Sequence, residues 1–299
     1  MTFSPLLAGT TDLHVHAGPS IMPRRFDALE VVRTAQAAGM SGVLLKDHYV
    51  PTQDIARLAQ NELERQHGPG AMTVAGAVCL NASIGGFNPA AVEVGLKAGA
   101  RMVFLPTVNA QHHEEMIEGK ERGKLMPTPL LKRRENIAPP DGVDGWESWL
   151  EIADLIAEHD AVLSTGHMDR DSSLAFIASA YKRGARRFLV THASLFEPLD
   201  RPFVEAIEPF GAFFEVTALP TLFPGFTLPE FGQPIQAVVR LLGELGPAQT
   251  VLSSDCGHPE GPHTVEAFGD YLELLSRSGI PARDLTTMAA TNPTGLLRP

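Results

Sequence analysis

Cysteine is scarce in this chain of 299 residues, which contains only Cys79 and Cys256. Two cysteines cannot supply the disulfide framework of a small secreted domain, so a reducing compartment is the simplest setting. Long apolar runs are also missing, as is the basic segment followed by an apolar run that marks a signal peptide. We therefore expect a cytoplasmic protein that has no membrane anchor.

Positive charge is in short supply as well. The chain has 24 Lys and Arg residues against 35 Asp and Glu residues, which gives a formal net charge of −11. Nucleic-acid-binding surfaces usually need a basic stripe, so we expect no nucleic-acid partner. Apolar residues make up 44% of the chain and charged residues 20%, a balance that provides a core of normal size. The expected partner is a small-molecule substrate.

Short apolar runs alternate regularly with longer amphipathic stretches. Glycines such as Gly39 and Gly184 stand where helices give way to strands, as C-terminal caps do. Eight strand–helix units imply a parallel sheet that closes into a (β/α)8 TIM barrel, here one domain over residues 1–299. An open doubly wound sheet is disfavoured because no Gly-x-Gly-x-x-Gly follows the first strand. The expected strands are 10–17, 41–48, 73–80, 100–107, 161–167, 187–193, 212–218 and 250–256, and the expected helices are 27–39, 52–67, 89–98, 146–159, 171–183, 200–209, 233–245 and 263–279.

Two long loops interrupt this rhythm, at residues 108–145 and 219–234. Both follow barrel strands, so both belong to the rim on which such barrels carry their active sites. We expect Phe223 and Phe226 to offer an apolar wall to a substrate, with packing inside the loop as the alternative. Arg133 is expected to meet a substrate carboxylate. The two loops are therefore predicted to be lids.

Four of the expected strands end in residues that bind metals. The first carries His14 and His16, which are two apart and so project from the same face of a strand. The fifth, sixth and eighth strands end in His167, His192 and Asp255. Neutral imidazoles and a carboxylate suit zinc, manganese or iron. We expect these residues to hold one or two divalent ions, with zinc as the first expectation.

The order of these ligands along the chain resembles that of the amidohydrolase superfamily. The tail from Met288 to Leu297 is similar to the closing helix of that superfamily. The opening from Asp12 to Ser20 is similar to that of a poorly characterised amidohydrolase-like family. The resemblance spans the full chain and implies a metal-dependent hydrolase that forms a homo-oligomer.

The fourth strand departs from the superfamily pattern. Many binuclear members carry a carboxylated lysine there, but this strand ends without Lys, Glu or Asp. A lysine lies instead on the second strand, where a period of two puts Lys46 and His48 on the same side. If two ions bind, a carboxylated Lys46 is the expected bridge, and an ion pair with Asp47 or Asp12 is the alternative. His48 is expected to be a ligand, a substrate contact or a structural residue.

The expected chemistry is hydrolysis of an amide, cyclic imide or lactone bond. A divalent ion lowers the pKa of a bound water toward about 7. Asp255 would accept the proton of the attacking water and pass it to the leaving group. His192 or His258 would stabilise the developing oxyanion. A serine mechanism is disfavoured because no Gly-x-Ser-x-Gly motif occurs.

Other functions stay open. The pair Asp47–His48, and His258 three residues after Asp255, are similar to features of the PHP family of phosphoesterases, which implies phosphoester hydrolysis. A metal-dependent decarboxylase of an aromatic acid is another alternative, because the Phe-rich loop would suit such a substrate. A binding protein that retained the metal site is the third.

Five further polar residues have weaker expectations. His112 and His113 are expected to be solvated loop residues, with a role in the site as the alternative. His67 and His159 fall at helix ends and are expected to be exposed or capping residues. Glu215 on the seventh strand could enter the barrel, but the sequence shows no partner for it.

Overall fold

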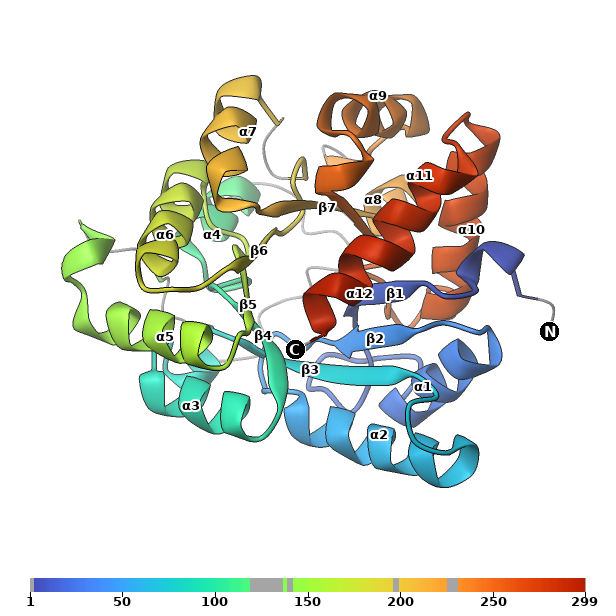
Figure 1. Cartoon of the computed structure of the whole chain (residues 1–299), viewed down its shortest axis with the longest axis horizontal. Helices are drawn as coiled ribbons and strands as arrows, with labels where there is room; N and C mark the ends of the chain where they lie inside the picture. The colour runs from blue at the N-terminus through green and yellow to red at the C-terminus, as the bar shows by residue number, and fades with distance from the viewer. Residues whose placement is uncertain (1–2, 119–136, 139–141, 196–198, 225–230, 299) are drawn as a thin grey trace.

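The computed structural model is a parallel barrel of eight strands, β1 to β8 in sequence order (Figure 1). It describes residues 3–118, 137–138, 142–195, 199–224 and 231–298. All eight predicted strands are present: β1 (Thr11–Val15), β2 (Gly42–Leu45), β3 (Thr73–Cys79), β4 (Ala100–Phe104), β5 (Val162–Ser164), β6 (Arg187–Val190), β7 (Phe213–Thr217) and β8 (Thr250–Ser253). The prediction of a (β/α)8 barrel is therefore confirmed.

The barrel closes between its first and last strands. Neighbouring strands pair in parallel from β1 through β8, and the ring is completed by a bridge between Val15 and Cys256. Two backbone hydrogen bonds support this closure, from the Asp255 amide to the His14 carbonyl at 2.9 Å and from the His16 amide to the Cys256 carbonyl at 3.0 Å. The strand ends that carry predicted metal ligands thus form the seam of the barrel.

Each strand is followed by the predicted helix, which packs on the outside of the barrel. These helices are α1 (Ala28–Ala37), α2 (Gln53–His67), α3 (Pro89–Lys97), α5 (Glu147–Glu158), α6 (Arg170–Lys182), α7 (Arg201–Ile207), α9 (Ile235–Leu245) and α10 (Thr264–Arg277). Further helical segments are α4 (Gln111–Ile117), α8 (Leu219–Leu222), α11 (Ala282–Thr286), α12 (Asn292–Leu297), a π-helical turn at Thr287–Thr291, and 3₁₀ turns at Pro5–Leu7, Ala82–Ile84, Val143–Gly145, Glu208–Phe210 and Pro247–Gln249. Of this second set, the sequence pointed only to the closing helix at the tail.

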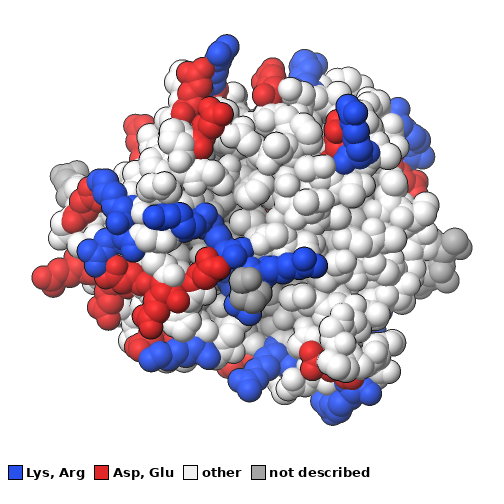
Figure 2. All heavy atoms as spheres, viewed as in Figure 1, with Lys and Arg blue, Asp and Glu red and all other residues white. Residues whose placement is uncertain are grey.

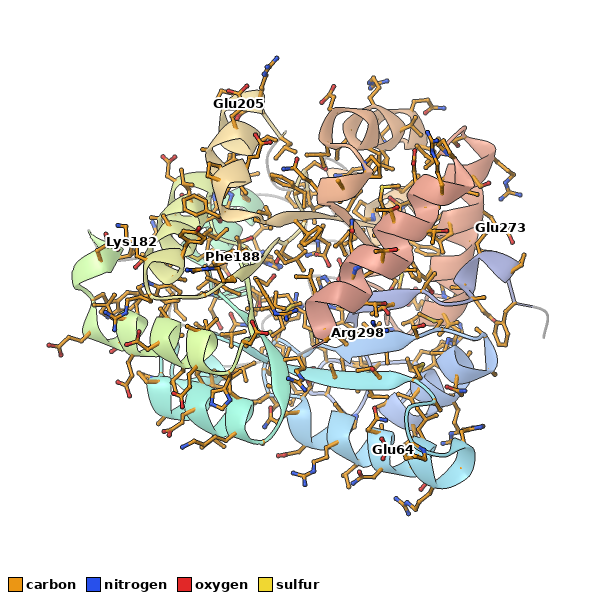
Figure 3. The ribbon with its side chains drawn as sticks, in the orientation of Figure 1. Glu64, Lys182, Phe188, Glu205, Glu273 and Arg298 are labelled. Atoms are coloured by element: carbon orange, nitrogen blue, oxygen red, sulfur yellow. The ribbon has the colours of Figure 1, made fainter. Side chains whose placement is uncertain are left out.

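Apolar packing occurs in two layers. The larger layer lies between the strands and the outer helices and includes Phe188 of β6. Glu205 and Glu273 lie at the outer edge of the molecule in Figure 3. The smaller layer fills the barrel itself and includes Leu13, Met102 and Phe104. Leu296 and Leu297 of α12 join this inner layer. The closing helix therefore covers the end of the barrel that faces the viewer in Figure 1 and leaves the opposite mouth for chemistry.

The outer surface carries charges of both signs. On the face shown in Figure 2, acidic and basic side chains lie next to one another at the side formed by α5 and α6. Ion pairs join Lys182 to Asp144 at 2.5 Å and Arg187 to Asp160 at 2.7 Å. Among the helices that the structure describes, none is both long and apolar enough to cross a lipid bilayer.

The junction of β3 and α2 depends on Gly76. A Cβ atom at this position would lie 2.5 Å from the backbone N and Cα atoms of Gln53 and 2.6 Å from the carbonyl carbon of Thr52. The Thr52 hydroxyl ties the same junction together by accepting the Ala77 amide at 2.8 Å. Because all of these atoms are backbone or buried, the helix cannot move away without disturbing the barrel.

We expect Gly76→Ala to lower the free energy of unfolding by about 1–3 kcal/mol, the usual cost of overpacking a core. Urea unfolding followed by circular dichroism measures the change. Gly243→Ala on α9 is the control, since its added methyl group meets nothing within 4 Å and should stabilise the helix by about 0.5–1 kcal/mol. Equal effects of the two substitutions would contradict this account of the junction.

Candidate metal centre at the barrel mouth

Five histidines form a closed ring at the carboxyl ends of the strands. They come from the ends of β1, β2, β5 and β6, and all but His48 have exposed fractions below 9%. The separations of the imidazole centroids around the ring are 5.2 Å for His14–His16, 5.0 Å for His16–His48, 6.0 Å for His48–His167, 5.3 Å for His167–His192 and 5.0 Å for His192–His14. The structure thus brings the predicted histidine ligands together and adds His48 to them.

The Asp255 carboxylate lies against this ring. One of its oxygens is 3.0 Å from His14 Nε2 and 3.2 Å from His16 Nε2, and the other is 3.8 Å from His192 Nε2. Two ligands of a tetrahedral zinc ion, each about 2.1 Å from the metal, are roughly 3.4 Å apart. Ligand atoms of His14, His16 and Asp255 all lie within 4.8 Å of one another. This set of donors therefore fits a divalent ion in both chemistry and spacing.

Two of the predicted ligands have left-handed backbone conformations. His192 has φ 50° and Asp255 has φ 55°, a region that side chains other than glycine rarely occupy. Such conformations persist where the surroundings enforce them and are frequent at functional sites. Here the His192 amide donates to Glu215 at 3.3 Å, and the Asp255 amide donates to the His14 carbonyl at 2.9 Å. The left-handed turn explains why β6 and β8 end earlier than predicted.

Hydrogen bonds to Nδ1 orient the two histidines of β1. His14 Nδ1 is 3.2 Å from both carboxylate oxygens of Glu215, and His16 Nδ1 is 3.0 Å from the Lys46 carbonyl oxygen. Since neither acceptor carries a proton, we assign the hydrogen to Nδ1 in both rings. The lone pair then lies on Nε2, the atom that faces Asp255.

Two of the other three ring histidines have similar supports. His48 Nδ1 is 2.9 Å from the hydroxyl of Thr107, which also accepts a hydrogen bond from the Asn81 amide group at 2.6 Å. His167 Nδ1 is 2.8 Å from Nδ1 of His113. The prediction that His113 is a solvated loop residue is therefore wrong. It lies on α4 with an exposed fraction of 4%, because that part of the long loop is a helix that packs over the barrel mouth.

Lys46 reaches into the centre of the site from the end of β2. Its Nζ is 2.9 Å from His14 Nε2 and 4.5 Å from the centroid of the Phe104 ring, and the residue is 1% exposed. Burial lowers the pKa of this amine. Within the described residues no carboxylate oxygen comes within 4.0 Å of it, so an ion pair with Asp47 or Asp12 does not form. Lys46 therefore has the position of a ligand or a bridge, and its carboxylation stays a prediction.

Burial keeps most of the ring neutral. It lowers the pKa of His16, His48 and His167 well below the usual value and that of His192 to about 4. Neutral imidazole is the form that binds a metal, so these side chains are ready to do so at neutral pH.

The two buried carboxylates are held ionised. Burial by itself raises the pKa of Glu215 and of Asp255, but attraction to His14 and His192 outweighs it. The pKa of Glu215 falls to about 2, and that of Asp255 lies well below its usual range. The site therefore contains two negative charges, which would offset the charge of a bound dication.

Glu215 and His113 are functional candidates that the sequence did not identify. Glu215 was visible on β7, but its partner His14 lies 201 positions away and is brought near only by closure of the barrel. The sequence did not predict the burial of His113, because the residues around it have no strong helical pattern. Glu215 contacts the imidazole of His14, and His113 contacts that of His167, so both orient members of the ring.

The remaining predicted site residues have mixed outcomes. His258 is half-buried in the loop after β8, and its Nδ1 accepts a hydrogen bond from the Glu260 amide at 3.2 Å. Phe223 follows α8 and packs on Leu219 and Cys256. The predictions for Phe226 and Arg133 fall outside the described residues.

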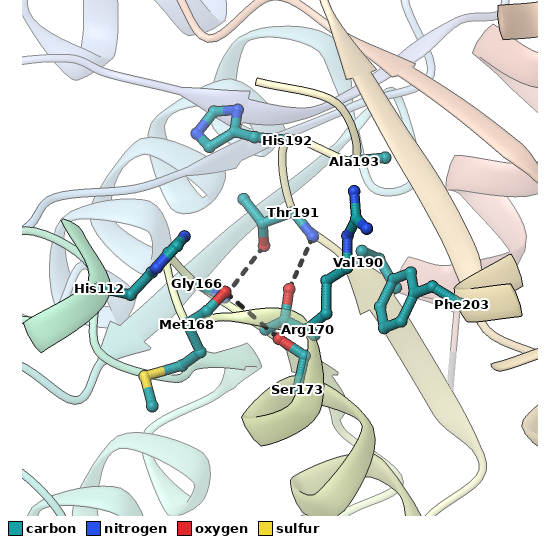
Figure 4. Close-up of a pocket in the computed structure, with 11 residues that line it drawn as sticks. His112, Gly166, Met168, Arg170, Ser173, Val190, Thr191, His192, Ala193 and Phe203 are labelled. Atoms are coloured by element: carbon teal, nitrogen blue, oxygen red, sulfur yellow. Dashed lines mark hydrogen bonds between the residues drawn. The ribbon is translucent and has the colours of Figure 1, made fainter. Parts of the chain in front are cut away.

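Apolar residues of three rim loops meet above the mouth. Ile117 of α4 and Phe231 of the loop after β7 are buried against each other, with Met116 and Leu195 packed beside them. Beside this cluster, a small pocket of about 40 Å³ opens next to His192 and is lined by His112, Thr165, Gly166, Met168, Arg170, Ser173, Val190, Thr191, Ala193 and Phe203 (Figure 4). The mouth is therefore partly covered, with a small recess on the side of β5 and β6.

Solved structures with a similar fold include an amidohydrolase from Pseudomonas aeruginosa, with a TM-score of 0.61, 16% identity and coverage of 99% of this chain and 98% of that chain. An N-acetyl-D-glucosamine-6-phosphate deacetylase from Mycobacterium smegmatis has a TM-score of 0.55 at 15% identity, covering 97% and 76%. Dihydroorotase from Saccharomyces cerevisiae has a TM-score of 0.53 at 13% identity, covering 97% and 84%. These likenesses establish a shared barrel architecture.

Comparison with curated proteins gives no match. Residues 9–215 match a family of unknown function, DUF6282. The matched segment runs from β1 through most of β7 and includes all five ring histidines and Glu215. Because this match covers more than half of the chain, the protein belongs to the DUF6282 family.

Proposed function

We propose that this protein is a metal-dependent hydrolase that cleaves an amide, cyclic imide or lactone bond in a small molecule. The observation that carries the proposal is the closed ring of five strand-end imidazoles at the barrel mouth, against which the ionised Asp255 carboxylate lies. A bound divalent ion, zinc first and manganese or iron as alternatives, would polarise the scissile carbonyl and activate the attacking water. The shared fold with amidohydrolase and dihydroorotase structures supports the same reaction class.

His14, His16 and Asp255 would form the core of the metal site, with His167, His192 and Lys46 as further ligands for one or two ions. The two oxygens of Asp255 have different surroundings. One lies between the Nε2 atoms of His14 and His16, while the other faces His192 at 3.8 Å. The second oxygen would accept a proton from the attacking water and return it to the leaving group.

Other residues would hold the substrate. His192 lies beside Asp255 and would stabilise the developing oxyanion. His258 would use Nε2 for any substrate contact, because its Nδ1 accepts the Glu260 amide. His48 completes the ring opposite His192 and would contact the substrate, and Phe223 would contribute an apolar wall.

Acyl hydrolysis is favoured over phosphoester hydrolysis by the position of Asp47. That carboxylate accepts hydrogen bonds from the amides of Tyr49 and Val50, at 2.7 and 3.2 Å, and from the hydroxyl of Ser20. It thus caps the loop after β2, a role that does not require metal binding. One of the two features that resemble phosphoesterases therefore has a structural explanation.

The first prediction concerns metal content. His14→Ala and His16→Ala should each lose zinc after loading and dialysis, because three converging donors become two, while circular dichroism shows a folded barrel. Elemental analysis by mass spectrometry measures the metal. His67→Ala, at the exposed end of α2, is the matched control and should retain wild-type metal. Full metal occupancy together with full turnover in both ring variants would refute the proposed centre.

The second prediction concerns Glu215 as a positioning residue. Glu215→Gln keeps the volume but removes the charge that holds the proton on His14 Nδ1, so metal affinity should fall by about 10- to 100-fold. Competition with a chromogenic chelator measures the affinity, and Glu244→Gln on the exposed face of α9 is the control. An unchanged affinity would mean that the Glu215–His14 contact does not tune the metal centre.

The third prediction assigns the proton shuttle to Asp255. Asp255→Asn retains size and a coordinating oxygen but loses basicity, so turnover should fall by about 100-fold or more at nearly normal metal content. Rates are compared at matched metal occupancy on the most reactive member of an amide, imide and lactone panel. Wild-type turnover in this variant would transfer the role of base to His258 or His48.

A further inference from the structure

Arg24 is a cation beside the metal centre that the proposed hydrolysis does not use. It lies in the loop that joins β1 to α1 and is half-buried. Its Nη2 is 3.2 Å from His16 Nδ1, so only one imidazole ring separates it from the atoms that face Asp255. Its other contact is with the sulfur of Met22 at 3.7 Å, a weak acceptor.

The contact with His16 cannot satisfy this guanidinium. An arginine has only donors, so it could bond His16 Nδ1 only if that nitrogen carried a lone pair. The Lys46 carbonyl, 3.0 Å from the same nitrogen, is an acceptor and requires Nδ1 to carry the hydrogen. That tautomer is also the one that presents Nε2 to a metal. In the metal-binding form of the site, Arg24 therefore has no acceptor at His16.

No carboxylate supplies the missing acceptor. Within the described residues no carboxylate oxygen lies within 4.0 Å of the Arg24 guanidinium, and its Nε is fully buried without a hydrogen-bond partner. Asp47 and Asp255 exert a longer-range attraction, but burial outweighs it and lowers the pKa of Arg24. A guanidinium whose Nε is buried without a partner is costly, because nothing compensates for the lost hydration of that group. A ligand of opposite charge would supply the compensation.

The loop holds Arg24 firmly in this place. Its two ends are joined by hydrogen bonds from the Gly18 amide to the Phe26 carbonyl at 2.9 Å and from the Ala28 amide to the Gly18 carbonyl at 2.8 Å. Its middle is fixed by Ser20, whose hydroxyl donates to Asp47 and accepts the Met22 amide at 3.1 Å. These hydrogen bonds fix the backbone of the loop that carries Arg24. A preorganised loop lowers the entropy cost of binding a ligand.

We propose that Arg24 binds a carboxylate group of the substrate and that the protein acts on small acids whose carboxylate lies close to the scissile bond. This assignment rests on the proposed hydrolase function for the identity of the ligand as a substrate. A planar guanidinium matches a carboxylate in shape and in charge, and one cation balances one carboxylate. The position of Arg24 next to a ligand imidazole places the carboxylate within a few bonds of the reacting carbonyl.

A binding experiment that does not depend on turnover tests the assignment. The melting temperature of the zinc-loaded protein is measured with N-acetylglycine and N-acetyl-β-alanine, with their neutral carboxamides, and with methylphosphonate. At least one of the two acids should raise the melting temperature by about 2 °C or more, and the carboxamides should not. Arg24→Met should abolish this shift, and Arg24→Lys should retain part of it, because lysine keeps the charge but not the planar fork.

Arg25→Gln is the matched control, since Arg25 is exposed and its Nη1 donates instead to the Gly261 carbonyl at 2.8 Å. It should behave as the wild type. A shift that survives in Arg24→Met, which binding of the acid to zinc alone would give, overturns the proposal. So does the lack of a shift with both acids. If methylphosphonate raises the melting temperature more than either acid does, and if this shift depends on Arg24, then the group that Arg24 binds is a phosphoryl group. That result would overturn the proposed substrate class.

Turnover separates this inference from the proposed function. On matched substrates with and without a carboxylate, Arg24→Met should lower the preference for the acid, as a ratio of kcat/KM, by about 10- to 100-fold. If no substrate is turned over but the Arg24-dependent shift is present, the hydrolase proposal fails and the anion site stands. If turnover occurs without any preference for acids, the anion site fails and the hydrolase proposal stands.

Discussion

Closure of the barrel between β1 and β8 is the constraint on which the rest of the molecule depends. The seam consists of backbone hydrogen bonds made by His14, His16, Asp255 and Cys256. Asp12 strengthens it by accepting the amides of His14 and Ser254, each at 3.0 Å. These hydrogen bonds fix the backbone of His14, His16 and Asp255. Closure of the barrel therefore also sets the distances between the two imidazoles and the Asp255 carboxylate.

Close packing around the seam leaves little freedom. A Cβ atom at Gly257 would lie 2.0 Å from the His16 carbonyl oxygen, so only glycine allows the chain after β8 to pass so near β1. The left-handed turn at Asp255 precedes this contact and directs the carboxylate over the mouth. Strain and crowding at this point are offset by the many backbone hydrogen bonds of a closed sheet.

Electrostatic balance explains why so many polar side chains can be buried at one end of the barrel. Four of the five imidazoles are oriented by a partner on Nδ1, which is Glu215, the Lys46 carbonyl, Thr107 or His113. Glu215 and Asp255 stay ionised because cationic and polar groups face them. Lys46 and Arg24 remain as basic groups without a carboxylate partner within the described chain. Such a site is suited to take up a cation together with an anionic ligand.

The sequence by itself determined the architecture and the principal donors. The alternation of apolar runs and amphipathic stretches predicts eight strands and their helices, because burial periodicity is a local property. The candidate ligands were identifiable because each ends an apolar run; they are His14, His16, His167, His192 and Asp255. The short helix α4 was not predicted, since it is stabilised by packing of Ile117 on Phe231 rather than by its own pattern.

Only the tertiary structure decided which groups act together. Contacts between segments that are distant in sequence pair Glu215 with His14 and His113 with His167. The loop after β1 places Arg24 where, among the described residues, no carboxylate pairs with it. The turns at His192 and Asp255 also break the strand periodicity from which side-chain direction is inferred. Strand order follows from local sequence, but the direction, protonation and pairing of side chains at the mouth follow from closure of the barrel.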